Sequence, residues 1–255
     1  MNSEEVDDLP VRRIAPQDLW EALRKGRDDF YARPTHGIFL CVIYPLTALV
    51  SIRLGLGYGM LPLIFPLLVG FALVGPLAAC GLYELSRRRE GGQDYAWWHV
   101  FDVLRAPSRW ALAALGIVMV GIFAAWLQTA LLVYELFFGA ALPESVAGFV
   151  QQLFGTREGW SLIALGCGLG FLFALVVFSI SVVSLPMLLE RRVSAGKAVA
   201  ISVRAVLHNP RTMALWGLVV AGLLVLGSLP LFFGLAIAMP VLGHATWHLY
   251  RRVVV

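Results

Sequence analysis

The chain has 255 residues, of which 59% are hydrophobic and 14% are charged, with a formal net charge of +4. Soluble domains carry about 25% charged residues, so this composition excludes an ordinary soluble protein and indicates several membrane-spanning helices. The cysteines Cys41, Cys80 and Cys167 each lie in an apolar stretch and form no C-x-x-C pair, so no cysteine metal site is expected. The sequence predicts no cofactor, and the expected partner is the lipid bilayer rather than nucleic acid.

Long apolar runs predict where the chain crosses the membrane. Five such runs stand out: Ile38–Leu54, Leu61–Leu85, Trp110–Phe138, Trp160–Leu189 and Met213–Tyr250. The last run would form a helix about 54 Å long, whereas the hydrocarbon core is only about 30 Å thick. Glycine, serine and proline in Gly227–Pro230 interrupt helices, so this run divides into Met213–Ser228 and Leu231–Tyr250. The sequence therefore predicts an all-α membrane protein with about six transmembrane helices.

The distribution of basic residues predicts the orientation of these spans. Of the 20 lysines and arginines, only Arg53 and Arg157 fall in segments that six alternating spans place on the outer side. Basic residues concentrate in the cytoplasmic loops of membrane proteins. We therefore expect the N-terminus and the C-terminus to lie in the cytoplasm.

An internal repeat organises the predicted spans into three hairpins. Val100–Leu112 and Val203–Leu215 are identical at six of 13 aligned positions, including Pro107 and Pro210. Each proline falls where a cytoplasmic helix ends and a membrane helix begins, which suits the conformational restriction of proline. We expect an acidic, disordered segment at residues 1–14 and a single transmembrane domain at residues 15–255, with repeats at roughly 15–93, 94–193 and 194–255.

Each hairpin is preceded by a segment with the pattern of an amphipathic helix at the cytoplasmic interface. Pro16 starts the first segment, Asp94 is the expected N-cap of the second, and Ser194 is the expected N-cap of the third. Their apolar faces are predicted to contain, in turn, Leu19, Leu23 and Phe30; Trp97, Phe101 and Leu104; and Val199, Val203 and Val206. Such helices anchor a bundle in the headgroup region, and they can also sense lipid or dock a partner.

No catalytic motif is present, so we expect a protein that is not an enzyme. His244 and His248 are four residues apart and share a helix face, an arrangement that can bind a metal or haem and that also occurs at membrane interfaces. We assign no metal site, and these two histidines are the only candidate ligands. Glu84 and Glu190 precede arginines near the cytoplasmic ends of their spans and are expected to pair with them. The candidate ligand contacts are His36, Glu84, Glu190, His244, Trp247 and His248.

Small residues recur in two of the predicted spans. Gly166 and Gly170 form a G-x-x-x-G pattern in the fourth span, and Gly217, Gly222 and Gly227 are spaced along the fifth. Glycine lets helix backbones approach closely in a membrane, where packing rather than the hydrophobic effect drives association. We expect these residues to mark helix contacts.

The C-terminal string G-H-A-T-W-H-L-Y-R, residues 243–251, resembles the end of an uncharacterised family of bacterial integral membrane proteins, a domain of unknown function. The prolines at 76, 107, 186 and 210 and the Trp97–Trp98 pair also resemble that family. The resemblance implies a multi-span protein of the bacterial inner (plasma) membrane.

Three kinds of function remain open at this level. The first is a non-enzymatic accessory, assembly or interaction component of a membrane complex. The second is a transporter or lipid-handling protein, which a polar cavity at the midplane of the membrane would favour. The third is a membrane enzyme acting on lipid, which convergence of His36, His244, His248 and Glu84 would favour. An exposed face of glycines and aromatic residues would favour the first.

Overall fold

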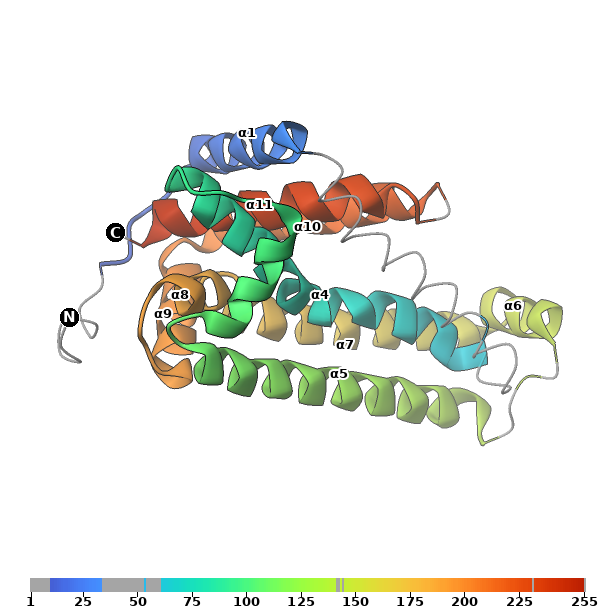
Figure 1. The fold of residues 1–255 in the computed structure, drawn as a ribbon. Helices are drawn as coiled ribbons and strands as arrows, with labels where there is room; N and C mark the ends of the chain where they lie inside the picture. The colour runs from blue at the N-terminus through green and yellow to red at the C-terminus, as the bar shows by residue number, and fades with distance from the viewer. Residues whose placement is uncertain are drawn as a thin grey trace. The chain divides into compact units, whose positions relative to one another are not determined.

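The computed structural model describes residues 10–33, 53, 61–140, 143, 145–230 and 232–254 (Figure 1). In this part the chain is all-α, as predicted, and its one extended pairing is an isolated bridge between Val11 and Val254. The elements in chain order are α1 (Pro16–Ala32), α4 (Leu61–Glu90), the 3₁₀-helix η1 (Trp97–Arg105), α5 (Arg109–Phe138), α6 (Val146–Gly155), α7 (Arg157–Ser181), α8 (Ser184–Glu190), α9 (Ala195–His208), α10 (Pro210–Ser228) and α11 (Leu235–Val253).

Four stretches of helix in the described part are long and apolar enough to cross a membrane: Leu61–Glu90, Arg109–Phe138, Arg157–Glu190 and Pro210–Ser228. They coincide with the second, third, fourth and fifth predicted spans. The expected break in the last apolar run is also present, because α10 ends at Ser228 and α11 begins at Leu235. The first predicted span lies outside the described residues apart from Arg53, and α11 is not among the four. The six-span layout and its threefold repeat therefore stay predictions.

The chain divides into two compact units, and the division passes through the long helices. One unit contains Met1–Pro45, Pro76–Ile117 and Phe178–Val255, and the other contains Leu46–Gly75 and Val118–Val177. In the second unit, the indole nitrogen of Trp126 donates a hydrogen bond of 2.8 Å to the backbone carbonyl of Pro66. The same indole packs against Gly170, where an added Cβ would lie 3.1 Å from the ring. Gly170 of the G-x-x-x-G pattern thus forms a close contact, as expected, and so does Gly227 beside Leu235. The expectation was wrong for Gly166, Gly217 and Gly222, because a Cβ added at any of them would meet no atom of the described residues within 4 Å.

In the first unit, α1 lies antiparallel to α11 (Figure 1). Arg252 contacts Asp18 near the start of α1, and His248 contacts Asp29 near its end. The helices meet most closely at Gly26, where an added Cβ would lie 2.5 Å from the backbone nitrogen of Ala245. The apolar face of α1, which includes the buried residues Leu19 and Phe30, is therefore covered by protein.

The segment before α1 is also packed against the C-terminal part of the chain. The backbone nitrogen of Arg12 donates to the carbonyl of Val253 at 2.9 Å, and that of Ile14 donates to Asn209 Oδ1 at 2.8 Å. The Thr212 hydroxyl donates to the carbonyl of Ile14. Residues 1–9 lie outside the described residues, and these contacts hold Arg12 and Ile14 against the C-terminal part of the chain. The disordered segment expected at residues 1–14 stays a prediction.

The other two amphipathic segments differ from each other. Ser194 caps α9 by accepting a hydrogen bond from the backbone nitrogen of Lys197, as predicted. The buried face of α9 is shifted by about one residue from the predicted valines; it consists of Ala198, Ile201, Ser202 and Ala205. The second segment winds as a 3₁₀-helix, and the residue that precedes it is Ala96 rather than Asp94. Because a 3₁₀-helix aligns side chains at positions i and i+3, its faces differ from those of the predicted α-helix.

Candidate functional site

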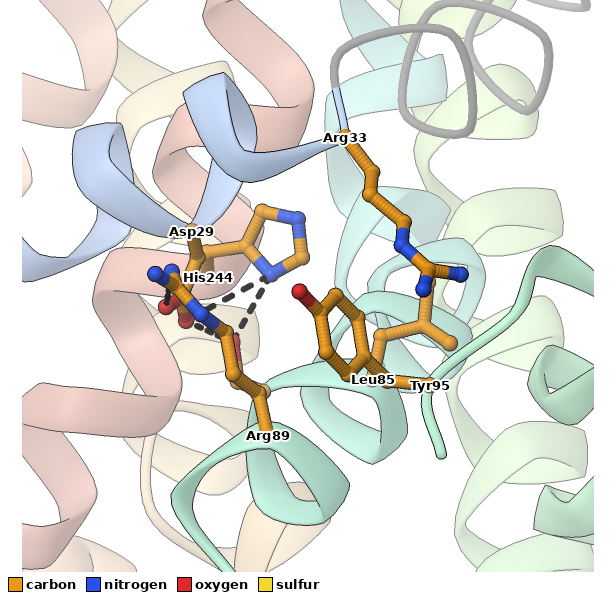
Figure 2. Close-up of a pocket in the computed structure, with 7 residues that line it drawn as sticks. Asp29, Arg33, Leu85, Arg89, Tyr95 and His244 are labelled. Atoms are coloured by element: carbon orange, nitrogen blue, oxygen red, sulfur yellow. Dashed lines mark hydrogen bonds and ion pairs between the residues drawn. The ribbon is translucent and has the colours of Figure 1, made fainter. Parts of the chain in front are cut away.

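A buried polar cluster joins α1, α4 and α11, and we call it the Asp29 cluster. It consists of Asp29 from α1, Ser86 and Arg89 from α4, and His244 and His248 from α11. Figure 2 shows Asp29, Arg89 and His244 of this cluster. The two histidines are only 5% and 7% exposed. The sequence pattern placed them together on one helix face, and the structure adds that this face is turned into the protein.

One oxygen of Asp29 is the centre of the cluster. Its Oδ2 lies 2.5 Å from the Ser86 hydroxyl and 2.8 Å from His248 Nε2. Arg89 donates to the other oxygen, Oδ1, at 2.5 Å. Ser86 Oγ also lies 2.7 Å from His244 Nδ1. An ionised carboxylate only accepts hydrogen bonds, so the serine proton points to Asp29, and His244 Nδ1–H donates to the serine oxygen.

The protonation state of Asp29 follows from these contacts. Burial alone raises the pKa of this carboxyl, but hydrogen bonds from His248 and Ser86 and the nearby histidines outweigh burial. The net result is a pKa below the ordinary value of 3.8. Asp29 is therefore ionised at neutral pH, and together with Arg89 it forms an ion pair whose carboxylate is buried.

Acid should weaken the attachment of α1 through this group. Because the pKa of Asp29 is lower in the folded protein than in the unfolded chain, its stabilising contribution is present above pH 3.8 and is lost as the pH falls through the folded-state pKa. We expect the unfolding free energy of the wild-type protein to fall more steeply below about pH 4 than that of Asp29→Asn. Denaturant unfolding in detergent across this range measures the difference, and parallel pH profiles would refute the assignment.

A small pocket opens beside the cluster. It has a cavity volume of about 10 Å³, which is close to the room needed by one water molecule. Its lining residues are Asp29, Arg33, Leu85, Ser86, Arg89, Tyr95 and His244. Figure 2 shows the Tyr95 side chain pointing towards Asp29 and His244, and the guanidinium of Arg33 lies 4.5 Å from the centre of the Tyr95 ring. Charged and polar side chains therefore line a space of about the size of one water molecule.

Glu84 forms a second polar group on α4. Its side chain is buried and accepts hydrogen bonds from Arg87 at 2.8 and 2.6 Å and from Arg88 at 3.1 Å. Arg88 also donates to Asp102 of η1 at 2.7 Å. The sequence pattern indicated pairing with the following arginines, and the structure extends this group from α4 to a second element, η1.

Glu190 belongs to a third group, at the C-terminal end of α11. The Tyr250 hydroxyl donates to Glu190 at 2.6 Å, and Arg251 donates to it at 2.9 Å. Arg251 also lies 3.3 Å from Glu90, which accepts a hydrogen bond from the indole nitrogen of Trp247 at 3.0 Å. Arg251 thus connects the ends of α4 and α8 through two carboxylates.

The structure does not unite the six predicted contact residues in one site. His244 and His248 share the Asp29 cluster, whereas Glu84 lies in the second group and Glu190 and Trp247 lie in the third; His36 is outside the described residues. In the described part of the chain, no three His, Cys, Asp or Glu side chains are placed to hold a metal ion.

Sequence reasoning missed Asp29, which is the residue that connects the three helices. A signal was present, because Leu19, Ala22, Gly26 and Asp29 recur at intervals of three and four residues and so share one face of α1. The cluster of charges at residues 24–29 concealed it, because such runs are usually exposed to solvent. Ser86 and Arg89 gave no comparable signal, since their partners are 57 and 60 residues away.

The long apolar helices and the family comparison together define an integral membrane protein. Residues 64–190 match the profile of a family described as "Predicted integral membrane protein (DUF2189)". The match begins within α4 and ends at Glu190, so it includes Ser86 and Arg89 of the Asp29 cluster. It excludes the other three residues of the cluster, Asp29, His244 and His248. The C-terminal G-H-A-T-W-H-L-Y-R string also lies outside it. Comparisons with curated proteins and with solved structures find no match.

Proposed function

We propose that this chain is a non-enzymatic component of a membrane complex in the bacterial inner membrane, where it serves an accessory, assembly or interaction role. In this proposal it crosses the membrane six times as three hairpins, with both termini in the cytoplasm. The proposal rests chiefly on one face of α10 and is supported by the arrangement of the polar groups.

The face of α10 that carries the proposal presents small residues to the surroundings. Within the described part of the chain, a Cβ added at Gly217 or Gly222 would meet no atom within 4 Å. Leu218 and Val225 are exposed about two turns apart on one side of the helix, and the two glycines, about 140° from each other, lie on either flank of that side. Small residues flanked by larger apolar ones allow a second membrane helix to pack closely. A helix from another protein is the occupant that we propose.

The polar groups favour a structural role over a catalytic one. Asp29, Glu84 and Glu190 are each engaged with arginine, and their remaining contacts are to side chains of the same chain. The cavity beside Asp29 has the volume of about one water molecule. Convergence of Glu84 with the two histidines would favour an enzyme, but Asp29 takes the place of Glu84 in the cluster.

The face of α10 can be tested by changing the size of its glycines. We expect Gly217→Leu/Gly222→Leu to reduce recovery of a stoichiometric partner by about tenfold, which corresponds to about 1.4 kcal/mol of association free energy. Gly217→Ala/Gly222→Ala is the matched control, because alanine is still small enough for close helix packing. The three proteins are purified from native membranes in mild detergent, and their complexes are weighed by native mass spectrometry.

The result separates the proposed function from its alternative. Equal partner recovery by the leucine and alanine variants would exclude this face of α10 as the interaction site. A chain that purifies without any protein partner, but with a stoichiometric lipid or solute, would instead support the transporter or lipid-handling function.

A further inference from the structure

The 3₁₀-helix η1 connects two candidate spans at the same end. It lies between Glu90, where α4 ends, and Arg109, where α5 begins. Three consecutive arginines, Arg87–Arg89, mark the end of α4, and Arg109 and Trp110 mark the start of α5. Arginine and tryptophan at the ends of apolar helices are typical of the headgroup level of a bilayer. The two spans therefore place η1 close to that level.

The 3₁₀ geometry sorts the side chains of η1 into three rows. With three residues per turn, side chains at positions i and i+3 eclipse each other. One row is His99, Asp102 and Arg105, in which His99 Nδ1 lies 2.6 Å from Asp102 Oδ2. A second row contains Val100, whose Cβ would lie 3.0 Å from a Cβ added at Gly81 of α4. These two rows hold η1 against α4, with Arg88 donating to Asp102.

The third row is apolar and faces outward, and we call it the η1 apolar row. It consists of Trp98, Phe101 and Leu104, which are 54%, 60% and 70% exposed. An α-helix would instead have aligned Trp97 with Phe101 and Leu104, as the sequence pattern predicted. The row presents large side chains without a cover from the described part of the chain, and it does so beside the membrane-entry point of α5.

Two arginines border the η1 apolar row. The Arg105 side chain, at the end of the polar row, is 85% exposed and donates to Asp102 Oδ1 at 3.4 Å. The Arg109 guanidinium lies 5.5 Å from the centre of the Trp110 ring, and both side chains are exposed at the start of α5. Apolar side chains flanked by exposed cations complement the acyl chains and phosphates of an anionic lipid surface.

We propose that the η1 apolar row inserts into the boundary between headgroups and acyl chains of the bilayer, and that Arg105 and Arg109 bind the phosphates of anionic phospholipids there. The rows that contain Val100 and Asp102 fix η1 to α4, so the η1 apolar row is held in place by the protein itself. This proposal does not depend on the partner proposed for α10.

The depth of Trp98 tests the insertion. The full-length protein is reconstituted in vesicles of phosphatidylcholine and phosphatidylglycerol whose acyl chains are brominated either near the headgroup or near the terminal methyl. The fluorescence of wild-type protein minus that of Trp98→Phe isolates the contribution of Trp98. We expect strong quenching by shallow bromines and weak quenching by deep ones. Trp216→Phe is the matched control, because Trp216 is buried in the protein and its contribution should respond to neither lipid.

Lipid selection tests the two arginines. Association of spin-labelled phosphatidylglycerol with the reconstituted protein is compared for the wild type, Arg105→Gln, Arg109→Gln and Arg157→Gln. We expect each of the first two variants to lower the preference for phosphatidylglycerol over phosphatidylcholine by about fivefold at its site, and Arg157→Gln to have no effect. Quenching of Trp98 by aqueous iodide but not by brominated lipid would overturn the proposal, as would an unchanged lipid preference in both the Arg105 and the Arg109 variant.

Discussion

Replacing Asp29 with alanine is expected to lower the free energy of unfolding by about 3 kcal/mol, because the change leaves the buried partners of a charge pair without an acceptor. Asp29 accepts hydrogen bonds from Ser86, His248 and Arg89, and these residues belong to α4 and α11. His248 is affected most, since its Nδ1 is already buried without a hydrogen-bond partner among the described residues. Losing the bond at Nε2 would leave neither ring nitrogen satisfied.

The neighbouring residue provides the control. Asp28 is exposed and pairs with Arg24 and Arg27 at the surface of α1, so Asp28→Ala should change stability by less than about 1 kcal/mol. Asp29→Asn keeps the size of the side chain but removes its charge. The difference in unfolding free energy between the Asn and Ala variants therefore separates the contribution of the charge from that of packing. Denaturant unfolding in mild detergent, followed by near-ultraviolet circular dichroism, compares the variants. Equal stability of the Asp28 and Asp29 variants would show that the cluster does not hold α1.

The features that the sequence predicted well depend on differences in residue type between neighbouring positions of the chain. Charged residues flank apolar runs, so the start of α5 at Arg109 and the end of α8 at Glu190 were each predicted to within one residue. The break after Ser228 was visible because glycine and proline act on the backbone of their immediate neighbours. Such signals need no knowledge of what the helix packs against.

The repeat shows where local pattern stops being sufficient. Val100–Leu112 and Val203–Leu215 share their apolar positions, yet the first contains the end of a 3₁₀-helix and the second contains the end of an α-helix. The described contacts differ in a way that only the fold reveals: η1 is tied to α4 through Arg88, whereas α9 begins with its own serine cap. The pattern of each segment alone does not reveal these contacts, so it does not distinguish the two helical types.

The Asp29 cluster could not be predicted from the sequence for a related reason. His244 and His248 were chosen because their spacing places them on one helix face, which is a local property. What they contact is not local, since 219 residues separate Asp29 from His248. Sequence spacing could identify which side chains share a face, but it could not identify the helix that covers that face.

Gly26→Ala is expected to lower the free energy of unfolding by about 1–3 kcal/mol, although the same change normally stabilises a helix. The added Cβ would lie 2.5 Å from the backbone nitrogen of Ala245 and 2.7 Å from the carbonyl oxygen of Val241. Backbone atoms cannot rotate away as a flexible side chain can, so α1 and α11 must separate. Their separation also lengthens the contacts of Asp29 one turn further along.

The sign of the change in unfolding free energy tests the close contact at Gly26, and Gly196→Ala is the control. Gly196 lies in α9, and a Cβ added there meets no atom of the described chain within 4 Å. Its replacement should be neutral or slightly stabilising, within about 0.5 kcal/mol, because only helix propensity changes. Opposite signs for the two glycines in the same unfolding experiment would locate the close contact of α1 and α11 at Gly26. A gain in stability from both would mean that the two helices are farther apart than the structure places them.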